Sequence, residues 1–523
     1  MERSLPPNMT KMALLLLSCL SALTFAVDSS AQSTGFLSPV PRASCGANDH
    51  PESGLQGQVP AFLRAAGFNG FNCNLELVGQ ARGDGANWQS AEYIDRADRK
   101  CAYHGTSLKT ANRTTLGVSV VDISDTANPA VLNHLTTISM VDPWESLKVN
   151  VPRQLLASVN ARNGNGGPEI DIYDISLDCR SPQLLSSLAV GKADGSTGIP
   201  ATLAGHEGNW APDGLTYYGG DLRTGGGRYY AIDTTDVRNP KLLAFWKPSV
   251  AIPHGLSVSD DGMTGFFVAQ GGTPIASLTN PAVAPTNGLL VYDLSQIQNR
   301  LPNPQVPQIG QLLWKDGSNA QHSIPVKIGG KPYLIFVDEG GSGTGLSSVT
   351  QATGACAASM PPFPMARIID VSDVTNPTLV ARVTQEINTV KACKLVLPDI
   401  TGLSLFTYGT HYCSVDNKQN ATTLACGQFN SGIRVYDIRD PLHVREIAYY
   451  NPPGTTTASP GSDHVRNGGW KAGGPDWCSS QVHLDASNGT LWTTCQDNGV
   501  LTLKFTNNVW PFPESSTPPG QQN

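Results

Sequence analysis

One phrase, written six times along the chain, limits what this sequence can fold into. Each copy is a short β-branched or aromatic run, an aspartate and a turn that proline usually closes. Proline cannot donate within a sheet and keeps the residue before it extended, so it marks where a new strand begins. Strand and turn recurring every 50 to 80 residues or so predict a β-propeller. The copies are VVDISDTANP, IYDISLDCRSP, AIDTTDVRNP, VYDLSQIQNR, IIDVSDVTNP and VYDIRDP, with aspartates at Asp122, Asp174, Asp233, Asp293, Asp370 and Asp437.

The two ends of the repeat region predict how the ring closes. Residues 71–80, FNCNLELVGQ, resemble the outer strands that follow each phrase, but no phrase precedes them. Residues 479–505 supply inner strands with no outer strand after them. We therefore expect an all-β, seven-bladed propeller closed by an N-terminal strand, which removes two free sheet edges.

Composition supports this fold class and excludes some partners. The chain has 523 residues, of which 15% are charged, with 53 glycines and 38 prolines, a balance typical of strands and turns. Its net charge of −7 and the lack of a basic cluster argue against nucleic acid as a partner.

The first residues are typical of an export signal. A lysine precedes a short apolar run, and small residues follow at a plausible cleavage site after Ala31 or Ala26. The run is too short to span a bilayer, so we expect no transmembrane segment and a secreted or periplasmic protein. Cys19, within the run, leaves a lipoprotein signal as an alternative. The expected organisation is a signal peptide at 1–31, a lead-in segment at 32–67, the propeller at 68–507 and a disordered tail at 508–523.

Ten cysteines follow Cys19, and an even number in an exported chain predicts up to five disulfides. We expect Cys413–Cys426 and Cys478–Cys495 to be local pairs. The sequence leaves the other pairings open.

Three histidines occupy one position of the repeat. His206, His254 and His322 each precede a turn glycine by eight residues, in HEGNWAPDG, HGLSVSDDG and HSIPVKIGG. The innermost strand of a propeller blade begins near one mouth of the channel, so equivalent positions should direct imidazoles toward a common region. The second strand returns to the same rim, where Glu339 and His411 lie in FVDEGG and TYGTHYC.

These residue types predict a metal site. Imidazole is a common ligand of zinc, copper and iron, and a carboxylate can complete such a site. We predict His206, His254 and His322 as metal ligands, with His411 or Glu339 completing the shell or acting as a catalytic base. The alternative is that the histidines hydrogen-bond neighbouring loop backbone or a substrate. The repeated aspartates, in contrast, are expected to accept backbone N–H bonds within their turns.

Three copies of the phrase, VVDISDTANP, AIDTTDVRNP and IIDVSDVTNP, resemble the LVIVD repeat of secreted or surface bacterial β-propellers, and the resemblance covers most of residues 75–505. More distantly, residues 206–272 are similar to the propellers that include selenium-binding proteins with methanethiol oxidase activity. That resemblance implies channel histidines that bind a metal ion, copper in those proteins, and it extends here to His206, His254 and His322.

The sequence thus predicts a secreted propeller with a small-molecule or metal site at its channel mouth, acting as a metal-dependent oxidoreductase or hydrolase. The alternative function is a non-catalytic surface module that binds protein or glycan through long loops. The longest loops are expected at residues 340–364 and 451–475.

Overall fold

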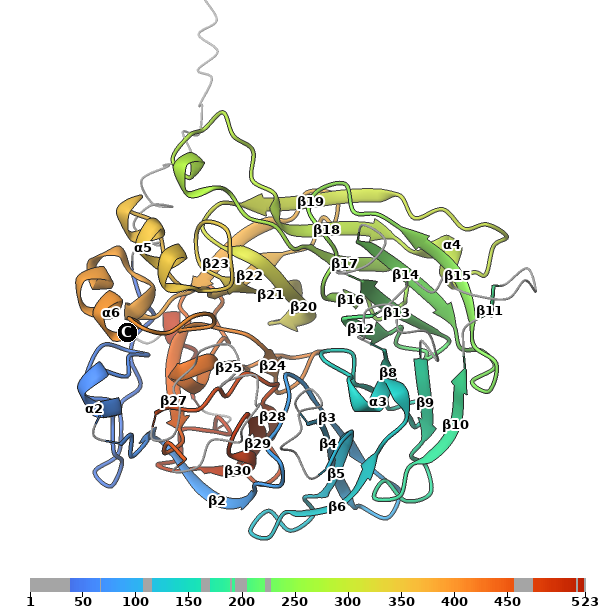
Figure 1. Ribbon diagram of the computed structural model, residues 1–523, viewed down its shortest axis with the longest axis horizontal. Coiled ribbons are helices and arrows are strands. Elements are labelled where there is room, and N and C mark those ends of the chain that lie inside the picture. Colours follow the sequence, from blue (N-terminus) through green and yellow to red (C-terminus); the bar gives the residue numbers. More distant parts are fainter. Residues whose placement is uncertain are drawn as a thin grey trace, which may run out of the picture.

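The structure is a computed structural model, and seven antiparallel sheets are arranged in a ring around a central channel (Figure 1). The described residues are 38–65, 67–106, 115–160, 170–188, 191–192, 205–221, 227–455, 474–513 and 516–521. The expected signal peptide at 1–31 lies outside them. The seven-bladed propeller predicted from the repeat is confirmed.

The first four sheets follow one another along the chain. The first contains β3 (Ser90–Ile94), β4 (Lys100–Gly105), β5 (Val118–Asp122) and β6 (Ala130–Leu135). The second contains β7 (Lys148–Asn150), β8 (Leu155–Val159), β9 (Ile170–Asp174) and β10 (Gln183–Leu188). The third contains β12 (Glu207–Trp210), β13 (Thr216–Asp221), β14 (Arg228–Asp233) and β15 (Lys241–Trp246), with the short β11 (Gly191–Lys192) parallel to β15. The fourth contains β16 (Leu256–Val258), β17 (Thr264–Ala269), β18 (Asn287–Asp293) and β19 (Gln308–Trp314).

The last three sheets complete the ring. The fifth contains β20 (Ser318–Ile328), β21 (Lys331–Gly340), β22 (Ala366–Asp370) and β23 (Thr378–Val383). The sixth contains β24 (Cys413–Val415), β25 (Thr423–Gln428), β26 (Gly432–Asp437) and β27 (Arg445–Asn451), extended by β1 (Phe71–Cys73). The seventh contains β28 (His483–Asp485), β29 (Thr490–Cys495), β30 (Gly499–Phe505) and, as its outermost strand, β2 (Leu75–Ala81). The N-terminal strand β2 therefore closes the ring, as the unmatched ends of the repeat predicted.

Helices are few and lie outside the sheets (Figure 1). Within the described residues the α-helices are α2 (Ala61–Ala65), α3 (Ile138–Val141), α4 (Ser295–Gln298), α5 (Val349–Ala357) and α6 (Cys393–Asp399). Short 3₁₀ turns lie at Ile275–Ser277, Glu386–Asn388, Val390–Ala392, Phe429–Ser431 and Pro519–Gln521. Among the described residues, no helix is both long and apolar enough to traverse a lipid bilayer.

Each repeated aspartate ends the third strand of its blade and stabilises the turn that follows. In all six copies one carboxylate oxygen accepts a hydrogen bond from the backbone N–H two residues later, at 2.8 to 3.1 Å. This is the Asx turn, in which a side chain takes the place of a backbone acceptor. The aspartates are part of the scaffold, as the sequence predicted.

Neighbouring sheets pack through their apolar faces. Ile335 and Ile368 of the fifth sheet, for example, share a buried cluster with Leu424 and Tyr436 of the sixth. Five disulfides add covalent links, and the two local pairs expected from the sequence are confirmed. The pairs are Cys45–Cys73, Cys101–Cys179, Cys356–Cys393, Cys413–Cys426 and Cys478–Cys495.

We expected the tail from residue 508 to be disordered, but its described residues contact the propeller. Trp510 is buried and packs against Phe505, and its indole N–H donates to Thr423 Oγ1 at 2.7 Å. The Arg439 guanidinium lies over the ring of Phe512 and donates to the backbone oxygen of Ser516. A proline-rich segment can be ordered where its aromatic side chains find apolar surface.

Candidate metal centre

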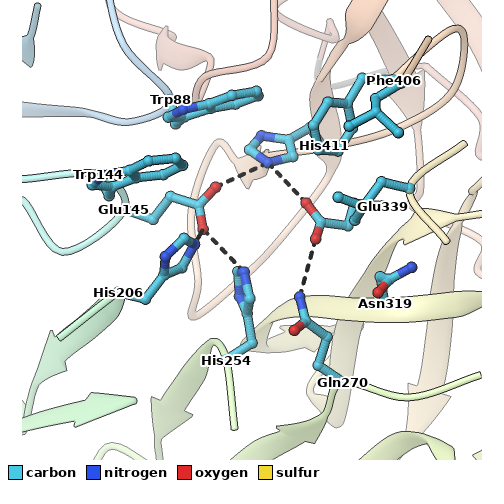
Figure 2. A pocket seen from close by; sticks show the side chains of 12 residues that line it. Trp88, Trp144, Glu145, His206, His254, Gln270, Asn319, Glu339, Phe406 and His411 are labelled. Carbon is cyan, nitrogen blue, oxygen red and sulfur yellow. Dashed lines mark hydrogen bonds and ion pairs between the residues drawn. The ribbon is translucent and has the colours of Figure 1, made fainter. Parts of the chain in front are cut away.

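Five acidic or imidazole side chains meet at one mouth of the channel. Glu145, His206 and His254 stand just before or at the start of the inner strands β7, β12 and β16, and His411 precedes β24. Glu339 lies near the end of β21, the second strand of its blade, which returns to the same rim. All five side chains are buried, and Figure 2 shows them facing a common space.

Glu145 is the centre of this group. Its Oε2 lies 3.2 Å from Nε2 of His206 and 3.2 Å from Nε2 of His254. Its other oxygen, Oε1, lies 3.0 Å from Nε2 of His411, which is also 3.4 Å from Glu339 Oε2 (Figure 2). The carboxylate is therefore surrounded by three imidazole nitrogens.

These short contacts lack the direction of hydrogen bonds. Among the described residues, neither Glu145 Oε2 nor His411 Nε2 has a partner in hydrogen-bond geometry, although both atoms are buried. Buried polar atoms without such partners are uncommon in native proteins and call for an explanation such as an ion. The ligands of a tetrahedral ion at about 2.1 Å lie roughly 3.4 Å apart. The 3.2 Å separations around Glu145 Oε2 fit that geometry.

The opposite ring nitrogens of two imidazoles are held by acceptors. His254 Nδ1 lies 3.0 Å from Glu207 Oε2 and 3.1 Å from the backbone oxygen of Gln321. His411 Nδ1 lies 2.7 Å from the backbone oxygen of Ser479. A carbonyl oxygen can only accept, so each Nδ1 carries a proton, and the ring in its neutral form directs the Nε2 lone pair into the site. Proteins orient metal-binding histidines in this way.

Gly255 makes room for the contact between His254 and Glu207. A Cβ at this position would lie 2.0 Å from the oxygen of Gln321 and 2.5 Å from Glu207 Oε2. Only glycine fits where the backbone approaches another chain segment so closely. The glycine that follows His254 is thus explained by the packing behind the imidazole.

The structure does not bring His322 together with His206 and His254, the other two histidines predicted as ligands. Its strand β20 contains a bulge between Ala320 and His322, and a bulge turns the following side chain away from its expected direction. The His322 ring stacks on Tyr412, and its Nε2 accepts the backbone N–H of Cys413 at 3.3 Å. Burial and the charge of Lys148 hold its pKa well below the usual value.

The charged groups of the site shift one another's pKa values. Burial raises the pKa of Glu145, but His254, His206 and His411 lower it more, and the result is well below the ordinary value. Burial lowers the pKa of an imidazole, but the neighbouring carboxylates, Glu145 first among them, raise it to about 9 for His254 and about 10 for His411. Protons on the imidazoles balance the carboxylates when no ion is bound. A divalent cation would displace these protons and take over their role.

Aromatic side chains form the walls of a cavity of about 260 Å³ above the charged group. Trp88, Trp144 and Phe406 line it together with Leu346 and Leu405, and Figure 2 shows the two indoles on the same side of the cavity as Glu145. A cavity with apolar walls and a few convergent polar groups is typical of a small-molecule site.

Two of these aromatic residues have a strained backbone. Trp144 has a φ of +42° and Phe406 a φ of +52°, in the left-handed region that bulky residues rarely adopt. The conformation costs about 1–2 kcal/mol for a residue with a Cβ. Such strain is concentrated at functional sites, where the surrounding structure maintains it.

The loops that carry Leu346, Leu405 and Phe406 are fixed by the insertion around α5 and α6. The backbone N–H of Phe406 donates to the oxygen of Leu346 at 2.8 Å, which joins the two loops across the cavity. The Cys356–Cys393 disulfide links α5 to α6 behind them. The segment 340–364, predicted to be a long binding loop, therefore forms one wall of the cavity. Much of the other expected long loop, residues 456–473, lies outside the described residues.

Sequence reasoning found four of the five clustered residues and missed Glu145. It lies three residues before β7, whereas His206 lies directly before β12, and a parallel bridge joins Glu145 to Glu207 in the next blade. Because the second blade has no histidine at this position, a search for matched histidines passed over it. The available signal was Pro-Trp-Glu, separated by Ser146 alone from the inner-strand sequence LKVN.

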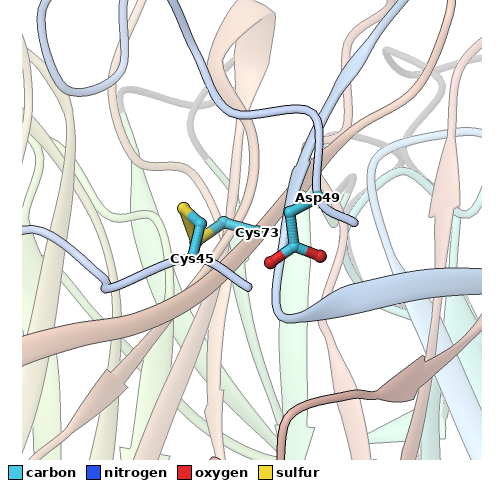
Figure 3. A group of neighbouring side chains, drawn as sticks. All are labelled: Cys45, Asp49 and Cys73. Carbon is cyan, nitrogen blue, oxygen red and sulfur yellow. A yellow bond between two sulfur atoms is a disulfide. The ribbon is translucent and has the colours of Figure 1, made fainter. Parts of the chain in front are cut away.

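Two other groups of acidic and cysteine side chains do not form metal sites. One consists of Cys45, Asp49 and Cys73, and the other of Asp95, Asp178 and Cys179. In both groups the cysteines are bonded in disulfides, as Figure 3 shows for the first. A disulfide sulfur is not the thiolate that binds a metal ion.

Comparison with known proteins finds similarity to solved structures alone. No family model and no curated protein matches the chain, so the resemblance to the LVIVD repeat rests on the repeated phrases themselves. Similar solved structures include a proposed 6-phosphogluconolactonase from Bacteroides uniformis, with 12% identity and a TM-score of 0.48 over 78% of this chain and 92% of that one. A periplasmic gluconolactonase from Pseudomonas aeruginosa has 10% identity and a TM-score of 0.45 over 76% and 94%. Sqt1 from Chaetomium thermophilum, solved bound to the N-terminus of ribosomal protein L10, has 13% identity and a TM-score of 0.44 over 82% and 98%.

Proposed function

We propose that this protein is an exported metalloenzyme that binds a divalent transition-metal ion through Glu145, His206 and His254. Two imidazoles and one carboxylate on one side of an ion leave coordination positions open for water or substrate. The observation that carries the proposal is Glu145 Oε2, which is buried, 3.2 Å from two imidazole nitrogens, and outside hydrogen-bond geometry with either. The five disulfides support export to an oxidising compartment.

The cavity indicates the kind of substrate. Its walls are the rings of Trp88, Trp144 and Phe406 and the side chains of Leu346 and Leu405. No lysine or arginine lines it among the described residues, so beyond the imidazoles and the proposed ion no cationic side chain there would neutralise a phosphate or a sulfate. We infer a small, uncharged and largely apolar substrate that is held by the rings with one polar group directed at the ion.

This chain's own residues have definite tasks in such a reaction. Glu207 and Gln321 fix the proton on His254 Nδ1, so that Nε2 is available to the ion. Glu339, which accepts from Gln270 Nε2 at 3.1 Å, lies across the site from His206 and His254 and is placed to receive a proton (Figure 2). The ion supplies Lewis acidity if it is zinc, and redox chemistry if it is iron or copper. Its identity therefore separates a hydrolase from an oxidoreductase.

The test is the metal content of the exported, disulfide-bonded protein, purified without a metal-affinity tag and reconstituted with Zn²⁺, Cu²⁺ or Fe²⁺. We expect at least one tightly held ion per chain in the natural protein and its loss in His254→Ala and Glu145→Gln. His322→Ala is the matched control, because it also removes a buried channel imidazole, and it should retain the ion. Absence of metal from the natural protein, or equal binding by His254→Ala, would contradict the proposal. Thermal unfolding of each variant verifies that it is folded.

A further inference from the structure

The two oxygens of Glu145 face two different groups of ligand atoms. Oε2 faces His206 and His254, while Oε1 faces His411, which in turn contacts Glu339. In Figure 2 these two groups lie on opposite sides of the carboxylate. Glu145 alone belongs to both groups.

One ion cannot contact all of these atoms as they are placed. Within each group the ligand atoms lie within 4.8 Å of one another. Among the described residues, no single set of atoms that all lie within 4.8 Å of one another includes both groups. Two ligands on opposite sides of one ion, each at about 2.1 Å, are separated by roughly 4.2 Å. Atoms further apart than 4.8 Å therefore belong to different ions, or one group binds none.

The second group is built as completely as the first. His411 is buried and its Nδ1 is fixed by the Ser479 oxygen at 2.7 Å, which directs Nε2 toward Glu145 and Glu339. Gln270 Nε2 donates to Glu339 Oε1 at 3.1 Å, which leaves Oε2 facing His411. His411 Nε2 itself has no partner in hydrogen-bond geometry among the described residues. A metal-binding imidazole needs one ring nitrogen held by a hydrogen bond and the other directed at the ion, and His411 meets both conditions.

We propose that the site holds two metal ions bridged by Glu145, the second bound by Glu145 Oε1, His411 and Glu339. This inference rests on the proposed function, which requires only the first ion. A carboxylate that binds one ion with each oxygen suits the separation of about 3.5–4 Å found in two-metal sites. Two ions so placed hold a water molecule between them and make it a stronger nucleophile at neutral pH. His411 and Glu339 are then ligands, and Glu339 binds the second ion in place of the proton-accepting role that it has with one ion bound.

Copper is the probe for the test, because nitrogen and oxygen donors bind Cu²⁺ most tightly among the divalent first-row metals. The full exported chain is loaded with Cu²⁺ and dialysed, and bound copper is counted per chain. We expect two ions in the natural protein and one in Glu339→Gln, which keeps the shape of the side chain and removes its charge. Glu76→Gln, an exposed change on β2, is the matched control and should keep both ions.

Electron paramagnetic resonance tests whether the ions are neighbours. Two Cu²⁺ ions bridged by one carboxylate couple magnetically, so the natural protein should give a weak or absent signal for its copper content. Glu339→Gln should give the full signal of one isolated ion. His411→Gln serves as the second variant if Glu339→Gln does not fold, with the same expected result.

The outcomes separate the two proposals. Two coupled ions, with one lost in Glu339→Gln, support the two-metal site. A single ion in the natural protein overturns the second site and leaves the proposed function intact. Two ions that persist in both Glu339→Gln and His411→Gln also overturn it, because the second ion would then lie elsewhere. No bound ion at all contradicts both proposals.

Discussion

Glu207 acts on the proposed metal centre without entering it. Its Oε2 accepts the Nδ1 proton of His254 at 3.0 Å, from the side of the ring opposite to Glu145. Both residues are buried, and burial raises the pKa of Glu207. Glu207 lies at the first position of β12, directly after the ligand His206, so one short segment both binds the ion and supports a second ligand.

We expect Glu207→Gln to weaken metal binding by about 10- to 100-fold, the usual cost of losing a group that orients a metal-bound imidazole. The amide can still contact Nδ1 but does not carry the negative charge that makes the imidazole a better donor. Competition with a chelator of known affinity measures the change. An unchanged affinity would show that the contact with Glu207 does not support a ligand. The exposed variant Glu76→Gln is again the control.

At the residue scale, the repeat located His206 and His254 because it fixes where each inner strand begins. It could not locate His322 correctly, because the bulge before that residue depends on how β20 pairs with β21 rather than on the spacing to a turn glycine. Glu145 was missed for another reason. Different residue types from neighbouring blades of a ring can bind one ion. A comparison that looks for identical residues finds only some of these ligands.

Among the elements, the insertion of α5 and α6 determines the shape of the cavity. The segment 340–364 looked like an irregular loop, because a nine-residue helix is too short to show a clear apolar period. The helix is stabilised by Ser348, whose side chain accepts the backbone N–H of Gln351, and by packing of Ala352 in a cluster that includes Val396 of α6. The packing contacts with α6 cross long stretches of sequence, so the strands could be predicted and this wall could not.

Removal of the Cys356–Cys393 disulfide tests whether the insertion of α5 and α6 shapes the cavity. Replacing both Cys356 and Cys393 by serine removes a link across 37 residues, which should cost about 2–4 kcal/mol in the free energy of unfolding. Metal content should not change, because Glu145, His206 and His254 belong to other blades. Substrate or inhibitor affinity should fall, since the loops with Leu346 and Phe406 lose their support. Denaturant unfolding and metal analysis measure the two effects, and loss of the ion in the double variant would contradict this division of roles.

For the whole molecule, ring closure is what gives the site its geometry. The candidate ligands come from the second to the sixth blades, and no two blades alone would hold them. The pattern of phrases and unmatched end strands was sufficient to predict seven blades and the closing strand β2. It was not sufficient to predict the site, because a channel brings together positions that lie up to 266 residues apart, from Glu145 to His411.

The buried charges of the channel make the free energy of unfolding depend both on pH and on whether a metal ion is bound. In the metal-free protein, the pKa of His254 is raised to about 9 and that of His411 to about 10. A raised imidazole pKa stabilises the fold fully below the unfolded value of about 6.5, and this contribution is lost as the pH rises through the folded value. The lowered pKa of Glu145 acts in the other direction, and its contribution is lost as the pH falls below about 4.5. The cluster therefore stabilises the metal-free fold most between about pH 5 and 6.5.

A bound ion changes this dependence, because it replaces the protons on the imidazoles. Metal affinity should rise by up to about tenfold per pH unit for each proton displaced. We expect the difference in Tm between metal-loaded and chelator-treated protein to be larger at pH 8.5 than at pH 6, measured in buffers that do not bind metal. Glu145→Gln removes the central carboxylate and should show little difference at either pH. An equal stabilisation at both pH values in the natural protein would mean that the ion displaces no protons, and would exclude the three imidazoles as its ligands.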